Sequence, residues 1–198
     1  MHYISHLQKD KKLAKIINGP TSSLKLQKNI SVRLMCSIMS QQLNTKVADV
    51  LKKRFFDLFK GKKPTNQQVL DLPFDTLRGI GLSNAKTNYV QNVAAFFIEH
   101  KLTDKKLHSM NDEEAMQLLT QIKGVGRWTV EMLLMFSLGR EDLFAPDDMG
   151  LQNAMIGLYK LDISDKKLLR EQIAKLSAKW SPYRTYACLY LWQWKDGK

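Results

Sequence analysis

The stretch QIKGVGRWTVEMLLMF, residues 121–136, interrupts a helical pattern with the tripeptide Gly-Val-Gly. After the tripeptide, apolar residues recur at three- and four-residue steps, which predicts a helix that begins near Gly126. A helix ending at Gln121 leaves carbonyls without partners, and the next helix presents unpaired amides at its start. Because Gly124 and Gly126 can adopt positive φ and allow close approach, we expect a tight hairpin with Val125 anchored in the core.

The amides of such a hairpin converge outward at a helix N-terminus and form a site for an anion. The chain carries 31 Lys and Arg against 19 Asp and Glu, a formal charge of +12. This excess favours a polyanionic partner such as a nucleic acid, so the anion is interpreted as a backbone phosphate. Two simpler alternatives remain. The glycines can serve only to pack a tight turn, and the lysines can serve only to keep the protein soluble.

Helical periodicity extends over most of the chain, and no alternating strand pattern is found, so we predict an all-α fold. A second Gly-aliphatic-Gly core, in LRGIGLSNAK at residues 77–86, suggests a second hairpin, although two unrelated turns would look alike. Two hairpins predict a two-lobed helical bundle with a ligand cleft between the lobes. We expect lobes over residues 30–105 and 106–198, with residues 1–29 as an N-terminal helical segment. Helices are expected over residues 30–40, 47–59, 83–100, 111–119, 149–159, 166–175 and 183–194, with Ser83 as an N-cap.

An acidic pair precedes one of these helices in the stretch PDDMGLQ, residues 146–152. Asp147 and Asp148 lie at a helix N-terminus, where the dipole favours negative charge. One interpretation is that Asp147 caps the helix while Asp148 points into the cleft and has a chemical role. The alternative is that both carboxylates only cap the helix.

Composition argues against several classes of protein. No stretch reaches the roughly 20 apolar residues that span a bilayer, and the N-terminus lacks a signal-peptide pattern. Cys36 and Cys188 are expected to be buried, reduced thiols. The four histidines, His2, His6, His100 and His108, lack ligand-like spacing, so a zinc site is not expected. We therefore expect a protein that is not exported, located in the bacterial cytoplasm with the nucleoid or in a eukaryotic nucleus.

Four stretches in order resemble the helix-hairpin-helix, Gly/Pro…Asp superfamily of DNA base-excision glycosylases, in particular the 3-methyladenine DNA glycosylase II type. They are SIMSQQLNTKVADVL, LRGIGLSNAKTNYV, IKGVGRWTVEMLLMFSLGREDLFAPDDMGLQNA and WSPYRTYACLYLW. The resemblance covers residues 30–192. It implies a DNA glycosylase that hydrolyses the N-glycosidic bond of alkylated bases, chiefly 3-methyladenine and 7-methylguanine, in base excision repair.

The family's catalytic aspartate falls on Asp148, which leaves Asp147 as the helix cap. A fixed carboxylate stabilises the oxocarbenium-like transition state and orients or activates water. Related enzymes that also cleave the strand carry a lysine at the position of Trp128, and an indole cannot form their Schiff base. The resemblance therefore implies a monofunctional enzyme. An iron–sulfur cluster needs four C-terminal cysteines, and Cys188 is alone there, so none is expected.

The resemblance also assigns a base pocket and a DNA-binding surface. Trp128 and Trp192 match pocket positions that hold a flipped, positively charged base. The pocket departs from some bacterial relatives by having Met132 and Met149, with Gly150 beside them, which leaves the substrate range open. Core packing is the alternative for each tryptophan, and it is the interpretation for Trp180 and Trp194.

Gln42 falls where the family inserts a plug into the gap left by the flipped base, although a polar helix-end residue is the simpler alternative. By resemblance, the amides of Gly124 and Gly126, with Thr129, grip a phosphate. The carbonyls of Thr120, Ile122 and Val125 are expected to hold Na⁺ or K⁺, and no other cofactor is expected.

The expected partner is double-stranded DNA with a damaged base, bound by a monomer. Two other hypotheses stay open at this point. One is a non-catalytic helix-hairpin-helix module that only binds DNA, and the other is a glycosylase for deaminated or oxidised bases.

Overall fold

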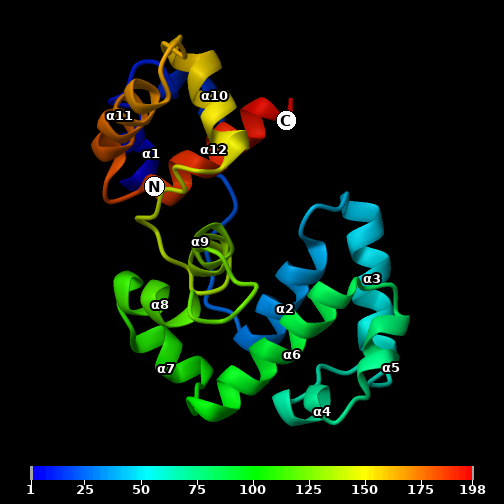
Figure 1. The fold of residues 1–198 in the computed structure, drawn as a ribbon. Coiled ribbons are helices and arrows are strands. Elements are labelled where there is room, and N and C mark those ends of the chain that lie inside the picture. Colours follow the sequence, from blue (N-terminus) through cyan, green and yellow to red (C-terminus); the bar gives the residue numbers. More distant parts are fainter. Residues whose placement is uncertain (1, 198) are drawn as a thin grey trace. The chain divides into compact units, whose positions relative to one another are not determined.

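The computed structural model describes residues 2–197, and every regular element in that range is a helix (Figure 1). The all-α class predicted from the sequence is confirmed. Each helix that we expected is present, with ends shifted by a few residues. The elements are α1 (His2–Leu7), η1 (Leu13–Ile16), α2 (Ile30–Ser40), α3 (Thr45–Asp57), α4 (Asn66–Leu70), α5 (Phe74–Gly79), α6 (Asn84–Glu99), α7 (Asp104–Ser109), α8 (Asp112–Leu119), α9 (Arg127–Phe136), α10 (Met149–Tyr159), α11 (Lys166–Ser177), η2 (Ala178–Trp180) and α12 (Arg184–Lys195).

The chain divides into two compact units. Unit 1 combines the described residues up to Lys25 with those from Leu134 onward, and unit 2 comprises Leu26–Leu133. The division differs from the expected lobes at residues 30–105 and 106–198. The hairpin after α8 belongs with α6, since Asn92 of α6 donates from Nδ2 to the carbonyl of Lys123 at 3.2 Å. None of the described helices is long and apolar enough to cross a bilayer.

In unit 2, α6 is the central helix and packs against α2, α4 and α5. Its buried face consists of Thr87, Val90, Val93, Ala94 and Phe97, which recur at the three- and four-residue steps of one helix face. Ser83 caps α6 as predicted, since its Oγ accepts a hydrogen bond from the amide of Lys86. These contacts place the start of α6 firmly against the rest of the unit.

In unit 1, the N-terminal segment is joined to the C-terminal helices through Asp10. The Asp10 carboxylate accepts from the hydroxyl of Tyr159 at 2.7 Å and from Nε1 of Trp180 at 3.2 Å. It also accepts from the backbone amides of Lys12 and Leu13. Residues far apart in sequence are thereby held together, because one carboxylate satisfies donors from η1, α10 and η2.

The two tryptophans that we assigned to core packing differ. Trp180 is 1% exposed, which confirms the prediction, whereas Trp194 is 40% exposed, so its assignment to the core is wrong. Trp194 lies in the last turn of α12, and the far edge of its ring lies near Gly157 of α10. The two thiols also differ, because Cys188 is buried and Cys36 is partly exposed.

Replacing Asp10 by Asn should lower the free energy of unfolding of unit 1 by about 1–3 kcal/mol at neutral pH, the range for removing charged hydrogen bonds. Burial raises the pKa of Asp10, but hydrogen bonds from Tyr159, Leu13 and Trp180 lower it below the ordinary value. A group with a lowered folded-state pKa stabilises the fold above its unfolded pKa, and this contribution is lost as the pH falls.

The stability difference between wild type and Asp10→Asn should therefore be constant above about pH 5 and shrink below about pH 4. Urea unfolding across this pH range measures it. Asp196→Asn, at an exposed position, is the control and should change little. A difference that grows on acidification would contradict the assignment of Asp10.

Candidate active site

Asp148 stands at the N-terminus of α10, where the chain changes from extended to helical. It is the N-cap residue, with φ −72° and ψ 116°, and its Oδ1 accepts from the amide of Leu151 at 2.8 Å. The expectation that Asp147 caps this helix is therefore wrong. A capping side chain must directly precede the first helical residue, which is Met149. Asp147 is exposed, and its carboxylate pairs with Arg170 at 2.9 Å.

The second donor to Asp148 comes from α12. Trp192 donates from Nε1 to the same oxygen, Oδ1, at 3.0 Å. The indole ring of Trp192 also lies against Phe136, with ring centroids 5.9 Å apart. Because a backbone amide and an indole both bind Oδ1, the plane of the carboxylate is fixed.

Gly150 leaves room for this arrangement. A Cβ built at Gly150 would lie 3.0 Å from Oδ1 of Asp148 and 3.2 Å from Nε1 of Trp192. Any side chain here would press on both partners of the hydrogen bond. Glycine lowers helix stability by up to about 1 kcal/mol relative to alanine. The space needed by Asp148 and Trp192 explains why glycine stands here.

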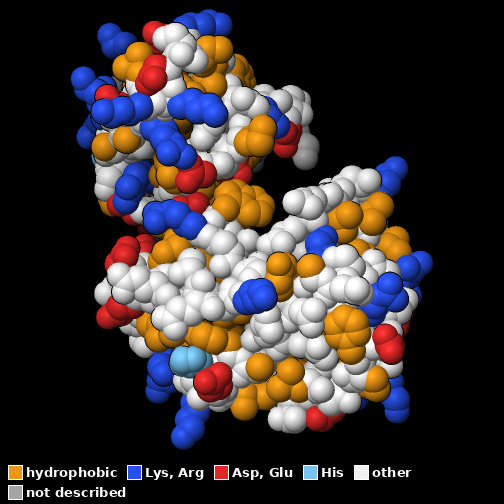
Figure 2. Space-filling model, viewed as in Figure 1, with side chains coloured by type: hydrophobic (Ala, Val, Ile, Leu, Met, Phe, Trp, Pro, Cys, Tyr) orange, Lys and Arg blue, Asp and Glu red, His pale blue; other side chains and the backbone are white. Residues whose placement is uncertain are grey.

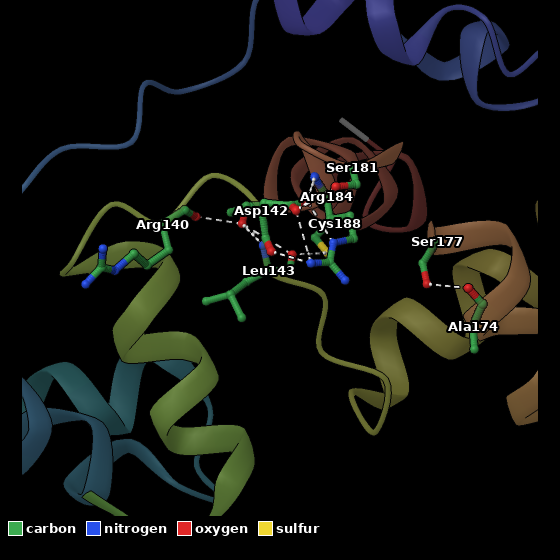
Figure 3. Close-up of polar contacts among 9 residues, drawn as sticks. Arg140, Asp142, Leu143, Ala174, Ser177, Ser181, Arg184 and Cys188 are labelled. Carbon is green, nitrogen blue, oxygen red and sulfur yellow. Dashed lines mark hydrogen bonds and ion pairs between the residues drawn. The ribbon is translucent and has the colours of Figure 1, made fainter. Parts of the chain in front are cut away.

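The segment that leads to Asp148 is tied to the start of α12 (Figure 3). Arg184 donates from Nε and Nη2 to the two carboxylate oxygens of Asp142, at 2.7 and 3.1 Å. The hydroxyl of Thr185 donates to the carbonyl of Arg140 at 2.7 Å and accepts from the amide of Leu143 at 3.0 Å. Burial raises the pKa of Asp142, but hydrogen bonds from Arg184 and Ser181 lower it below the ordinary value. The ion pair is consequently intact at neutral pH.

One face of α12 therefore supports the whole segment. Thr185, Cys188 and Trp192 are spaced by three and four residues and so share a face of the helix. Thr185 holds the start of the segment, Cys188 lies beside the carbonyl of Leu143, and Trp192 holds Asp148. A half-buried carboxylate supported in this way can meet a substrate with its charge in a fixed position, suited to stabilising positive charge.

The glycine hairpin forms in unit 2 as predicted, but its two glycines have different roles. Gly124 has φ +101°, and a Cβ there would fall inside the ring of Tyr89. At Gly126 a Cβ would meet nothing within 4 Å, so the surface beside it is open. Val125 is 4% exposed and anchors the turn, as expected. The close approach at Gly124 is thus made by a side chain of α6, and an anion would approach at Gly126.

Thr129 lies inside unit 2. It is 3% exposed, and its Oγ1 accepts from Nε2 of Gln41 at 3.2 Å. This hydroxyl therefore joins α9 to the end of α2. The phosphate-binding role of Thr129 stays a prediction, as do those of Gly124 and Gly126.

Gln42 occupies an exposed turn directly after α2 and has φ +59°, a conformation that side chains rarely adopt. Lys86 of α6 holds the backbone of this turn, since its Nζ donates to the carbonyls of Met39 and Gln41, at 3.1 and 2.6 Å. Burial lowers the pKa of Lys86. The side chain of Gln42 thus extends from a turn whose backbone is held by hydrogen bonds, which suits a residue that fills the gap left by a flipped nucleotide.

The remaining predicted pocket residues lie on two helices. Trp128, 40% exposed, and Met132 are four residues apart on α9 and share one of its faces. Met149 is the first residue of α10 and is 75% exposed.

The backbone carbonyls proposed for a cation lie between α8 and the hairpin. The carbonyl of Ile122 accepts from the amide of Val125 at 2.9 Å, so the turn that would carry the ligands is closed. The binding of Na⁺ or K⁺ by the carbonyls of Thr120, Ile122 and Val125 stays a prediction.

Sequence reasoning missed several residues that support the site. Gly150 had a detectable signal, since a glycine at the start of a helix directly after an acidic residue requires an explanation. Arg184 and Asp142 had none, because the 42 residues between them hide the pairing. Tyr89, Asn92 and Lys86 of α6 likewise look like ordinary surface residues of a helix.

Replacing Gly150 by Ala should lengthen the hydrogen bond between Trp192 and Asp148, because the new methyl group must displace one partner. We expect the indole proton resonance of Trp192 to shift upfield in proton–nitrogen correlation spectra. Gly157→Ala is the matched control on α10, since its Cβ would meet only the far end of the Trp194 ring, at 3.3 Å. An unchanged Trp192 resonance in Gly150→Ala would refute the role given to this glycine.

The sequence of this chain is similar to those of known proteins. The model of the HhH-GPD superfamily base excision DNA repair protein matches residues 35–179. The DNA-3-methyladenine glycosylase 1 of Schizosaccharomyces pombe is 34% identical over 187 residues, 92% of this chain and 80% of the relative.

Solved structures are similar as well. A 3-methyladenine DNA glycosylase of S. pombe in complex with abasic DNA superposes with a TM-score of 0.86 at 31% identity, over 99% of this chain and 97% of the other. A DNA-3-methyladenine glycosidase of Bacillus halodurans does so with a TM-score of 0.84 at 32% identity, over 96% and 87% of the two chains. With a family model that spans most of the chain and relatives alike in sequence and structure, this protein belongs to the HhH-GPD superfamily of base excision DNA repair proteins.

Proposed function

We propose that this chain is a DNA glycosylase that hydrolyses the N-glycosidic bond of alkylated bases, chiefly 3-methyladenine and 7-methylguanine. The observation that carries the proposal is the Asp148 carboxylate, held by the Leu151 amide and the Trp192 indole at the N-terminus of α10. The relatives named above are 3-methyladenine glycosylases, which supports this substrate class.

Asp148 has a defined part in the reaction. As the bond between the base and C1′ lengthens, the sugar gains positive charge, and a fixed carboxylate stabilises it without reorganising. Water then adds its hydroxyl to C1′, its proton passes to the carboxylate or to solvent, and the base leaves neutral. A 3-methylated adenine already carries positive charge as a nucleoside, so it leaves readily, and modest recognition is enough.

Aromatic side chains supply that recognition. A duplex hides the reactive bond, so the nucleotide must rotate out of the stack into a pocket. Trp128 and Trp192 each offer an aromatic surface to a cationic base, which contributes on the order of 0.5–2 kcal/mol. Met132 and Met149 add adaptable apolar surface, which suits more than one alkylated purine.

The DNA strand is bound by the hairpin. The open side of Gly126 faces outward at the start of α9, where amides attract a phosphate. Gln42, on its rigid turn, fills the space left by the flipped nucleotide. The carbonyls of Thr120, Ile122 and Val125 would hold Na⁺ or K⁺, and the ion would add positive charge near the phosphate.

Asp148→Asn should lower the rate of base release by a factor of about 10²–10³, because the charge that stabilises the sugar is lost. Asn is a good N-cap residue, so the fold should be retained. The assay incubates wild type and variant with methylated duplex DNA and separates free bases by chromatography.

The matched control is Asp147→Asn, which neutralises the exposed neighbour that pairs with Arg170. It should retain near-full activity. If Asp147→Asn abolishes release while Asp148→Asn does not, the catalytic assignment is wrong. If wild type binds duplex DNA and releases nothing, the chain is a binding module, and release of hypoxanthine or an oxidised purine would change the substrate class.

The enzyme should leave the strand intact at the abasic site, because the indole of Trp128 provides no amine for a Schiff base. Gel electrophoresis of the product duplex should show scission only after alkali treatment. Reduction with borohydride during the reaction should trap no covalent complex with DNA. A trapped complex would show that another amine of the chain acts as a nucleophile.

A further inference from the structure

A cavity of about 690 Å³ lies in unit 1, away from the proposed catalytic carboxylate. We call it the lysine-rimmed cavity, and it is bounded by α1, the segment before η1, the end of α10, α11 and η2. Tyr159, in its lining, is the last residue of α10, whereas Asp148 caps the first turn. A helix of this length spans about 15 Å, so the cavity and Asp148 belong to opposite ends of α10.

The rim is strongly basic. Five lysines contribute to the lining, against one aspartate among the described residues. Lys9, Lys11 and Lys12 come from the N-terminal segment, and Lys175 and Lys179 come from α11 and η2 with a spacing of one helical turn. Figure 2 shows blue Lys and Arg side chains gathered over the part of unit 1 that carries α1 and α11. The positive charge is thus spread over two separate segments.

The aspartate in the cavity offsets only one of the five positive charges, and its oxygens are already occupied by hydrogen bonds. Asp10 accepts hydrogen bonds from Tyr159, Trp180 and two backbone amides. Lys12 donates to the carbonyl of Tyr159 at 2.8 Å and lies over its ring. The field at the rim is therefore that of the lysines, and it favours an anionic ligand.

The floor is apolar. Leu7, Leu161, Leu176, Tyr159 and Trp180 contribute to the lining. His6 lies at the same cavity, and among the described residues its buried Nε2 has no hydrogen-bond partner. A buried polar atom without a hydrogen-bond partner is costly. The volume falls in the range of about 300–1,000 Å³ typical of ligand sites.

We propose that the lysine-rimmed cavity is a docking site for an acidic peptide segment of a partner protein, anchored by an apolar side chain. The lysines pair with carboxylates on either side of the segment, and the leucines and aromatic rings receive the anchor. A DNA backbone would use the lysines but leave the apolar floor exposed to water. The lysines lie on two separate segments of the chain. This spacing suits several carboxylates along a peptide better than one compact phosphate group.

The first test measures affinity with the full chain. A short fluorescein-labelled peptide that alternates glutamate with leucine or phenylalanine is titrated with protein at about 0.15 M salt and followed by anisotropy. The double variant Lys175→Glu/Lys179→Glu should weaken binding by at least about tenfold, since it reverses the charge of one side of the rim.

Two controls separate a built site from general attraction between charges. Lys166→Glu/Lys167→Glu makes the same change in net charge on the first turn of α11, outside the cavity, and should weaken binding by less than about twofold. An oligoglutamate of equal length, which lacks the anchor, should bind at least about tenfold more weakly than the alternating peptide. Equal effects of the two double variants, or equal binding of the two peptides, would overturn the proposal.

The second test locates the ligand. The indole groups of Trp180 and Trp192 bond to Asp10 and Asp148 respectively, so their resonances report the cavity and the proposed catalytic carboxylate separately. The alternating peptide should shift the Trp180 resonance and leave that of Trp192 unchanged. If a short duplex DNA shifts Trp180 and competes with the peptide, the cavity is a nucleic-acid site and the peptide proposal is wrong. Base release does not enter this test, so its outcome is independent of the proposed glycosylase activity.

Discussion

The site depends on one oxygen atom, Oδ1 of Asp148, which receives a backbone amide from its own helix and an indole N–H from α12. The amide contact places the carboxylate at the positive end of α10, and the indole contact fixes its rotation. Neither contact alone would fix both the position and the rotation of the carboxylate. Gly150 leaves room for the indole contact, because a Cβ there would lie 3.0 Å from Oδ1 of Asp148 and 3.2 Å from Nε1 of Trp192. Capping does not exclude the catalytic role proposed for Asp148, because the side chain that caps α10 is the one held by Trp192.

This double role has a mechanistic consequence. A carboxylate that caps a helix is oriented before substrate arrives, so the cost of arranging the charge is met when the protein folds. The hydrogen bonds between the segment before Asp148 and the start of α12 also help to orient this carboxylate in advance. Arg184 and Thr185 fix Asp142, Arg140 and Leu143, and two turns later Trp192 fixes Asp148. The position of Asp148 and of the segment before it is thus maintained by a single helix.

Much of the fold followed from local patterns in the sequence. The helices, the cap at Ser83 and the hairpin at residues 124–126 rest on spacing and propensity within a few residues, and each was found. The assignment of Asp147 as a cap failed because a shift of one residue in the helix start exchanges the roles of two adjacent carboxylates. Trp194 was misplaced because periodicity does not tell how far the core extends along a terminal helix.

Pairings over long distances in sequence could not be predicted. The contacts of Asp10 with Tyr159 and Trp180 join residues 149 and 170 positions apart, and no composition signal marks them. The same is true of the division into units. The hairpin belongs to unit 2, where Tyr89 and Asn92 of α6 contact it, and neither contact is visible in the local sequence pattern.

That division also affects how the chain matures during synthesis. Unit 2 is a continuous insertion within unit 1, so all of its residues are translated before the second part of unit 1. The N-terminal part of unit 1 must wait for partners such as Tyr159 and Trp180, which are translated much later. Domains tend to fold as units in order of appearance, so the hairpin-bearing unit can assemble first, while the unit with Asp148 is completed only after α12 has emerged from the ribosome.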